Sequence, residues 1–286
     1  MKIIDGKLIS LEIKEKLKEE ILKLKEKKII PGLGIILVGN DPASEIYVRN
    51  KIKMCDELGV CTLLYRFKED ARERDIIAQI QELNQDEMID GILVQSPMPA
   101  CFDEAKIISY VDSKKDVDGF GIYQLGALLS DQEQMVAATP LGIIKMLDHE
   151  RISVEGKHAV VVGASIIVGR PMAIALLNRG ATVTIAHSKT QNLKEITKQA
   201  DLLIVAIGHA RFISGEYVKD GAIVIDVGTN RVDGKLYGDV DFESVSKKAS
   251  YLTPVPGGVG PMTIVSLISN VVDRAKKRGE ENGSKN

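Results

Sequence analysis

Tyr47 and Lys51 are spaced four residues apart, and their side chains could bind a substrate and transfer a proton. They fall in a segment, 44–58, that predicts a helix, so the two side chains share one face. On a helical wheel at about 100° per residue, Lys51 falls in the apolar arc, whereas Arg49 and Lys53 fall on the polar side. Such a lysine either extends its amine to solvent at the rim or is buried with a lowered pKa, ready to act as a base.

A glycine-rich turn in the second half of the chain predicts an anion site. A predicted strand over 159–162 leads into it, and its key residues are Gly163, Ser165, Gly169 and Pro171, the last in the first turn of a helix. Backbone N–H groups and the positive helix end would face one point, as a dinucleotide pyrophosphate requires. The spacing G-x-S-x-x-x-G departs from G-x-G-x-x-G, so a turn that needs glycine for steric reasons alone is the alternative.

The residues about 20 positions beyond this turn favour NADP over NAD. A dinucleotide-binding fold contacts the ribose at the end of its second strand, here predicted over 182–186. An NAD site requires an acidic residue at that position. This chain instead has His187 followed by Ser188 and Lys189, which suit a 2′-phosphate. Small residues at the ends of two further predicted strands, Gly208 and Thr229, would lie at the same sheet edge.

The elements that must position these residues form an α/β pattern. Val/Ile/Leu-rich runs alternate with helix-period segments, which indicates βαβ units and mostly parallel sheets. The predicted strands are 34–38, 62–67, 91–95, 159–163, 182–186, 202–207 and 222–227. Predicted helices include 11–28, capped by Ser10, and 44–58, capped by Ser44 and closed by Gly59.

A break at 137–140 places a domain boundary between residues 138 and 139. The first domain is then 1–138 and the second 139–261. A last helix over 262–279 and a polar tail over 280–286 follow.

Composition narrows the class of protein. The 286 residues carry 38 basic and 40 acidic side chains, a net charge of −2, which argues against a nucleic-acid or membrane-surface partner. The three cysteines and four histidines show no metal-ligand spacing, so no metal is expected. With no secretory signal and no apolar run of about 18 residues, we expect a soluble cytoplasmic protein.

Three further segments carry a resemblance to a known family: 90–99 (DGILVQSPMP), 115–120 (KDVDGF) and 254–263 (PVPGGVGPMT). Together with 47–51 and 163–171, in this order, they make the chain similar to the bifunctional methylenetetrahydrofolate dehydrogenase/methenyltetrahydrofolate cyclohydrolases. The resemblance runs from Asp5 to the final helix, nearly the whole chain.

This resemblance implies an oxidation of 5,10-methylenetetrahydrofolate with NADP, followed by hydrolysis of the methenyl product to 10-formyltetrahydrofolate. It implies a folate-binding domain and a Rossmann-type NADP-binding domain with an active-site cleft between them. It further implies that the final helix packs back on the first domain, and that the chain forms a homodimer through its nucleotide domains.

Site residues follow from the same resemblance. Lys51 would be the acid–base group, Gln95 would hold it, Tyr47 would stack on the folate, and Asp118 would bind the pterin amino group. The remaining substrate-binding candidates are Gly257, Gly258 and Pro261. The cofactor-binding candidates are Gly163, Ala164, Ser165, Gly169, Ser188, Lys189 and Thr229.

Each role has a plainer alternative. Gln95 could merely cap a sheet edge, Asp118 could form a turn before Gly119, and Tyr47 could be core packing. The usual arginine after the turn glycine is Ala164 here, so we expect NADP to be preferred by a smaller margin than in relatives with that arginine. A monofunctional enzyme or a silent folate- or nucleotide-binding module are the alternative functions.

Overall fold

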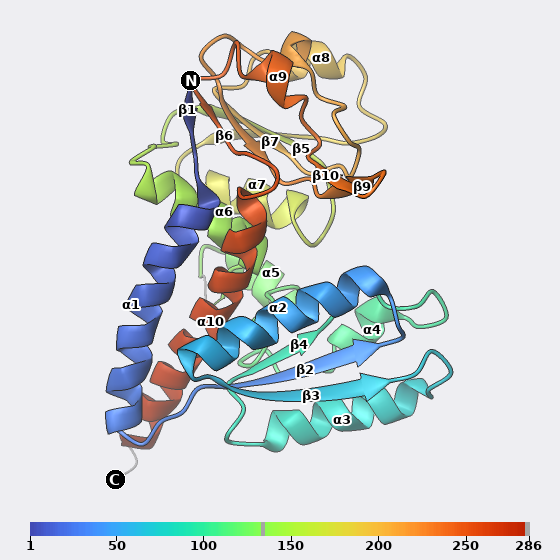
Figure 1. The fold of residues 1–286 in the computed structure, drawn as a ribbon, viewed down its shortest axis with the longest axis vertical. Helices are drawn as coiled ribbons and strands as arrows, with labels where there is room; N and C mark the ends of the chain where they lie inside the picture. Colours follow the sequence, from blue (N-terminus) through green and yellow to red (C-terminus); the bar gives the residue numbers. More distant parts are fainter. Residues whose placement is uncertain (133–134, 284–286) are drawn as a thin grey trace. The chain divides into compact units, whose positions relative to one another are not determined.

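The computed structural model describes residues 1–132 and 135–283. They form two compact units (Figure 1). The six-stranded unit comprises Met1–Leu11, Leu128–Gln132 and Thr139–Thr263. The three-stranded unit comprises Glu12–Ala127 with residues 135–138 and 264–283. Two long helices, α1 (Gly6–Glu26) and α10 (Val259–Gly283), each begin in the first unit and continue into the second.

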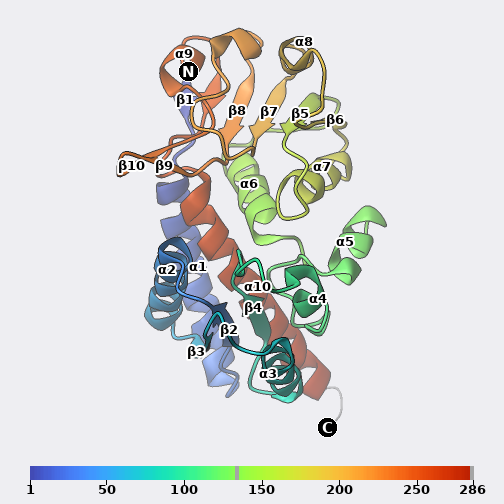
Figure 2. The ribbon, with the colours of Figure 1, turned by 90° about the vertical axis from the view of Figure 1, so that its right-hand side faces the viewer.

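The six-stranded unit is a parallel sheet, with every neighbouring pair parallel. Its strands are, in spatial order, β1 (Lys2–Ile3), β11 (Tyr251–Leu252), β8 (Ile223–Asp226), β7 (Leu202–Val205), β5 (His158–Val162) and β6 (Thr182–Ala186). Figure 2 shows β8, β7, β5 and β6 side by side. Because carboxyl ends of parallel strands meet at one edge, the loops after these strands lie together there.

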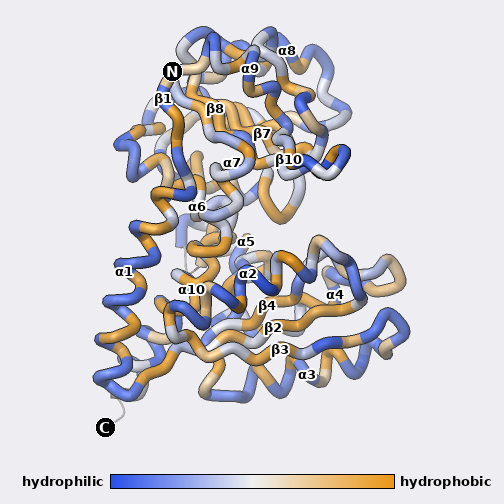
Figure 3. The backbone as a smooth tube through the Cα atoms, in the orientation of Figure 1, coloured by the Kyte–Doolittle hydropathy of each residue, from blue (hydrophilic) through white to orange (hydrophobic). Residues whose placement is uncertain are grey.

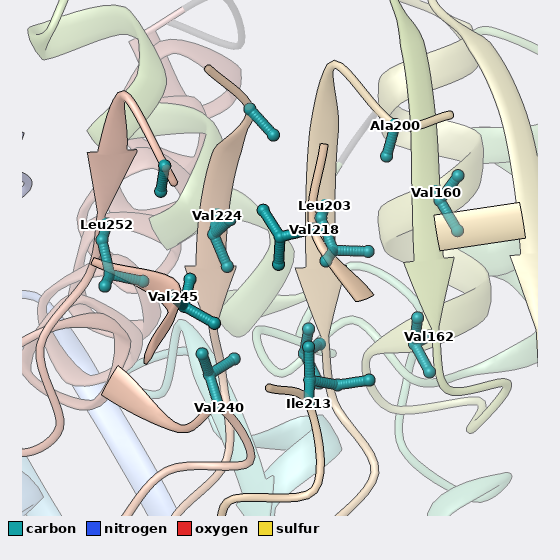
Figure 4. Close-up of a cluster of buried hydrophobic side chains, with 13 residues drawn as sticks. Val160, Val162, Ala200, Leu203, Ile213, Val218, Val224, Val240, Val245 and Leu252 are labelled. Atoms are coloured by element: carbon teal, nitrogen blue, oxygen red, sulfur yellow. The ribbon is translucent and has the colours of Figure 1, made fainter. Parts of the chain in front are cut away.

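Helices and a hairpin complete this unit. They are α6 (Ala138–His149), α7 (Gly169–Leu177), α8 (Leu193–Thr197), α9 (Phe242–Val245), the 3₁₀ turn η1 (Gly215–Tyr217), and the antiparallel strands β9 (Asn230–Val232) and β10 (Lys235–Tyr237). One face of the sheet contributes Val160, Leu203 and Val224 to a core that Val218 and Val245 cover (Figure 4). The core is aliphatic, as expected for parallel strands that are covered by other elements.

The three-stranded unit has the parallel order β3 (Cys61–Phe67), β2 (Gly32–Val38) and β4 (Gly91–Val94). Its shorter helices are α2 (Pro42–Leu58), α3 (Glu73–Gln85), α4 (Glu104–Ile108) and α5 (Ile122–Leu129). The helices α2 and α3 cover opposite faces of the sheet (Figure 1). Every residue of the central strand β2 is therefore buried. Figure 3 shows the hydrophobic run of β2 between helices whose residues alternate in hydropathy.

The helix α10 is fastened to this unit by polar contacts. Arg278 makes a two-pronged ion pair with the buried Asp90, with Nε–Oδ1 at 2.7 Å and Nη2–Oδ2 at 3.0 Å. The helix begins three residues before and ends four residues after the predicted 262–279. The predicted polar tail, 280–286, is thus helical as far as Gly283, and 284–286 lie outside the described residues.

Two predicted helix caps are wrong. The first helix begins at Gly6, and Asp5 Oδ1 accepts a hydrogen bond from Leu8 N, whereas Ser10 lies inside the helix. The second begins at Pro42, and Asp41 Oδ2 accepts from Ser44 N at 2.7 Å. In both places an aspartate further upstream supplies the acceptor that the serine was expected to provide, so the helix starts earlier. No helix in the described ranges is long and apolar enough to cross a membrane.

Candidate functional site

Lys51 is a buried lysine on the apolar face of α2. The buried residues of this helix are Ser44, Val48, Lys51, Cys55 and Leu58. The Lys51 side chain is only 7% exposed. This excludes the alternative in which the lysine lies at the edge of the apolar face and extends its amine to solvent. Tyr47, one turn earlier, is 39% exposed, which excludes core packing and leaves its ring free for a ligand.

Gln95 holds the Lys51 amine. It directly follows β4, and its backbone N–H donates to Ile36 O at 2.9 Å, which extends the strand pairing by one residue. Its side-chain Nε2 donates to Ser96 O, so its Oε1 is oriented to accept from Lys51 Nζ at 3.0 Å. Gln95 is buried and does more than cap the sheet edge, because it orients the one titratable amine buried on α2.

Lys51 and Asp118 influence each other's charge. Burial lowers the pKa of the Lys51 amine, and the nearby Asp118 carboxylate opposes this shift. Burial raises the pKa of Asp118 to about 6, the Lys51 charge opposes that rise, and Asp116 adds to it. Both groups are thus shifted toward their neutral forms, an arrangement typical of sites that move protons near neutral pH.

The loop that carries Asp118 is held by its neighbours. Asp116 Oδ1 accepts from Gly119 N at 3.0 Å, and its Oδ2 accepts from Gly121 N at 2.7 Å. Asn270 on α10 donates through Nδ2 to Val117 O at 2.9 Å. Asp116, not Asp118, therefore makes the local turn, and sequence reasoning missed both Asp116 and Asn270.

Asp118 is left available for a ligand. Among residues 1–132 and 135–283, no donor lies within hydrogen-bond distance of its carboxylate. With Asp116 and Phe120 it lines a small pocket against Ile92 and Val94 of β4. The carboxylate can therefore accept hydrogen bonds from a bound molecule.

In the six-stranded unit, the glycine turn after β5 packs backbone against backbone. Gly163 has φ +128°, and a Cβ there would lie 2.2 Å from Ala206 O. A Cβ on Gly169, the first residue of α7, would lie 2.0 Å from Gly163 O. Ser165 Oγ accepts from Val168 N at 3.1 Å and so closes the turn internally. The bare backbone and the start of α7 fit the pyrophosphate of a dinucleotide.

We expect Gly163→Ala to destabilise the protein by about 1–3 kcal/mol, because both the positive φ and the contact with Ala206 O penalise a side chain. Thermal unfolding measures the loss. Gly156→Ala is the control, since Gly156 has φ +70° but open space around its Cβ position. Equal losses in the two variants would show that the contact with Ala206 has no role.

The second predicted cofactor loop, 187–190, follows β6, the neighbour of β5. Gly163 N donates to Ala186 O at 2.9 Å, so the turn and the loop over 187–190 leave the sheet together. Ser188 and Lys189 are exposed there, and no acid accompanies them. Thr229, after β8, is exposed at the same edge of the sheet.

Two buried aspartates that sequence reasoning missed organise this edge. Asp226, the last residue of β8, accepts from the N–H groups of Gly228 and Asp239 at 3.0 and 2.9 Å. Asp239 in turn accepts from Ile207 N and Gly208 N at 2.7 and 3.0 Å. Burial raises the pKa of Asp226 to about 6. Neither aspartate belongs to a periodic pattern, so only the fold reveals them.

The remaining substrate candidates also lie in the six-stranded unit, between β11 and the first turn of α10. Gly257 O accepts from Lys7 N at 2.9 Å, Gly258 is buried, and Pro261 is the third residue of α10. The structure thus groups Lys51, Gln95 and Asp118 in one unit and the cofactor candidates in the other. The described residues contain no cluster of three potential metal ligands.

Comparison with known proteins matches the two halves of the chain to two family models. Residues 4–118 match the family model for the tetrahydrofolate dehydrogenase/cyclohydrolase catalytic domain, and residues 137–279 match that for its NAD(P)-binding domain. The bifunctional protein FolD of Halalkalibacterium halodurans is 51% identical over 275 residues, covering 96% of this chain and 99% of that protein.

Solved structures show the same fold. The bifunctional FolD methylenetetrahydrofolate dehydrogenase/cyclohydrolase of Campylobacter jejuni has a TM-score of 0.96 and 50% identity, covering 97% of this chain and 99% of that one. The Trypanosoma brucei methylenetetrahydrofolate dehydrogenase-cyclohydrolase, complexed with NADP and inhibitor, has a TM-score of 0.92 and 33% identity, covering 96% and 97%. The chain therefore belongs to the tetrahydrofolate dehydrogenase/cyclohydrolase family of two-domain α/β enzymes.

Proposed function

We propose that the chain oxidises 5,10-methylenetetrahydrofolate with NADP and hydrolyses the resulting 5,10-methenyltetrahydrofolate to 10-formyltetrahydrofolate. The observation that carries this proposal is the buried Lys51 amine, held by Gln95 and facing the charge of Asp118. The family's two activities support it. We assign folate binding to 1–138 with the helix 262–279, and NADP binding to 139–261.

The hydrolysis needs a base, and Lys51 supplies one. As the oxygen of water bonds to the methenyl carbon, the neutral Lys51 amine takes the released proton, and the ammonium later returns it to the folate nitrogen as the carbon–nitrogen bond breaks. Gln95 Oε1 accepts a Lys51 N–H and so orients the lone pair. Because the substrate is already cationic, a neutral lysine also avoids charge repulsion.

The oxidation needs orientation more than acid–base chemistry. NADP, when bound, supplies the hydride acceptor. The residues that would hold it are Gly163, Ala164, Ser165, Gly169, Ser188, Lys189 and Thr229. On the substrate side, the exposed Tyr47 ring stacks on the folate, and Asp118 accepts from the pterin amino group. Gly257, Gly258 and Pro261 complete the proposed folate contacts.

A coupled assay tests both activities. The purified protein is mixed with methylenetetrahydrofolate and NADP, and reduced nicotinamide and methenyl absorbance are followed together. We expect nicotinamide reduction with only transient methenyl absorbance. Persistent methenyl absorbance would indicate a dehydrogenase alone. If no nicotinamide is reduced, methenyltetrahydrofolate is supplied directly: its hydrolysis would then indicate a cyclohydrolase alone, and unchanged methenyl absorbance a binding module.

Folate affinity should depend on pH through Asp118. Its pKa of about 6 lies above the ordinary aspartate value, so the carboxyl group is neutral below about pH 6 and charged above it. Because the charged form accepts the pterin donors, we expect the Kd for folate to rise about tenfold per pH unit below pH 6. Calorimetry across this range checks the slope. The Asp118→Asn protein should lack it, and a flat profile in the unaltered protein would count against the assignment.

We further propose that the protein acts in the cytoplasm as a homodimer, with no nucleic-acid or membrane partner. Its three free cysteines suit a reducing compartment, and its net charge of −2 suits a small-molecule enzyme. Sedimentation of the purified protein tests the dimer, since a monomer at micromolar concentration would exclude it.

A further inference from the structure

Arg170, which is not among the predicted cofactor residues, contacts Ala164, the residue that replaces the family's usual arginine. Arg170, the second residue of α7, folds back so that its Nε donates to Ala164 O at 3.0 Å. Its backbone N–H donates to Ser165 O at 3.0 Å, which ties the start of the helix to the same turn. We propose that Arg170 contacts the 2′-phosphate of NADP and sets the preference for NADP over NAD. This inference rests on the proposed function.

The Arg170 guanidinium has N–H donors that make no hydrogen bond within the described ranges. Its Nε is used by Ala164 O, and within the described ranges neither Nη1 nor Nη2 has a hydrogen-bond or ion-pair partner. The side chain is exposed. A guanidinium held at Nε with two free nitrogens presents the planar fork that binds phosphate oxygens in pairs, which a lysine cannot do.

The turn that Arg170 contacts lies beside the second predicted cofactor loop, 187–190. Val162 pairs with Ala186, and Gly163 N donates to Ala186 O at 2.9 Å. The turn that Arg170 contacts and the loop with Ser188 and Lys189 therefore begin after paired residues of adjacent strands. Neighbouring strands lie about 5 Å apart. The ribose-sensing position lies at this second strand end. A guanidinium, an ammonium and a hydroxyl, with no acid in 187–190, suit a phosphate dianion.

The competing role for Arg170 is a contact with the pyrophosphate at the start of α7. That contact would be common to both dinucleotides, whereas a 2′-phosphate contact affects NADP alone. Binding constants for the two cofactors therefore separate the two roles without relying on turnover.

The test is calorimetric titration of NADP and NAD into the full-length protein and its variants. We expect Arg170→Met to raise the Kd for NADP roughly 10- to 100-fold and to leave the Kd for NAD within about threefold. Adding Ala164→Arg to that variant should restore tight NADP binding, because its guanidinium starts from the residue that Arg170 now clasps. Arg179→Met, two residues beyond the end of α7 and paired with Asp148, is the control and should change neither constant.

The outcomes are distinct. Equal weakening of NADP and NAD would place Arg170 at the pyrophosphate and overturn the inference, as would an unchanged NADP Kd in a folded Arg170→Met protein. Failure of the unaltered protein to bind NADP would instead overturn the proposed function.

Discussion

Replacing Lys51 by methionine should lower the rate of methenyltetrahydrofolate hydrolysis by roughly 10²- to 10⁴-fold, because it removes the general base and keeps the apolar stem. Hydride transfer depends less on this amine, so it should fall by a smaller factor, and methenyltetrahydrofolate should accumulate in the coupled assay. Lys53→Met is the matched control. Lys53 lies on the exposed side of the same helix, and its replacement should change neither rate.

The same substitution should raise the melting temperature. Burial lowers the pKa of Lys51 below its ordinary value of 10.5, so the ammonium form is penalised in the folded protein but not in the unfolded chain. This penalty grows as the pH falls below 10.5 and is present at neutral pH. Methionine removes it, so a gain in stability should accompany the loss of hydrolysis. A folded Lys51→Met protein that hydrolyses at the unaltered rate would refute the role of Lys51.

Asp118→Asn should weaken folate binding roughly 10- to 100-fold and leave NADP binding unchanged. The carboxylate accepts at both oxygens, whereas the amide accepts at one and presents donors to the pterin donors. Because Asp116 makes the turn through Gly119 and Gly121, the loop should keep its shape in the variant. Calorimetry with each ligand measures the two affinities.

The control for this variant is Asp70→Asn, an exposed aspartate in the same unit. It should leave both affinities unchanged. If Asp118→Asn binds folate as tightly as the unaltered protein, Asp118 has no contact with the pterin.

The position of Lys51 on the apolar face of its helix was predictable because helix geometry links it to residues one turn away on either side, whereas the sequence left open whether its amine reaches solvent. The periodicity of α2 places Lys51 on the same face as Val48 and Cys55, all of them buried. Its partner was not predictable from spacing. Gln95 lies 44 residues away and reaches Lys51 only because β2 and β4 pair in parallel, with Ile36 opposite Val94. The contact between Lys51 and Gln95 was expected from the resemblance to known enzymes and not from the helical periodicity.

The roles of neighbouring acids could not be separated from the sequence. Asp116 and Asp118 share one short segment, and either could have formed the turn before Gly119. Only the fold shows that Asp116 forms it, and that Asn270, 153 residues beyond Val117, secures the loop. Long-range contacts of this kind leave no local pattern.

The shortest strands were not predicted, for a related reason. The strands β1 and β11 have two residues each, too few to show an alternation, and they are stabilised by pairing with each other and with β8. The longer strands were predicted to within two residues at every end, because their buried apolar runs are long enough to recognise.

The central claim, that Lys51 is a neutral base, is tested most directly by an NMR titration of its side-chain amine. The Lys51 signal is assigned by its loss in the Lys51→Met protein. We predict that the Lys51 amine titrates below the ordinary lysine pKa of 10.5, because of its burial. A Lys51 amine that titrates at the ordinary value would contradict the account.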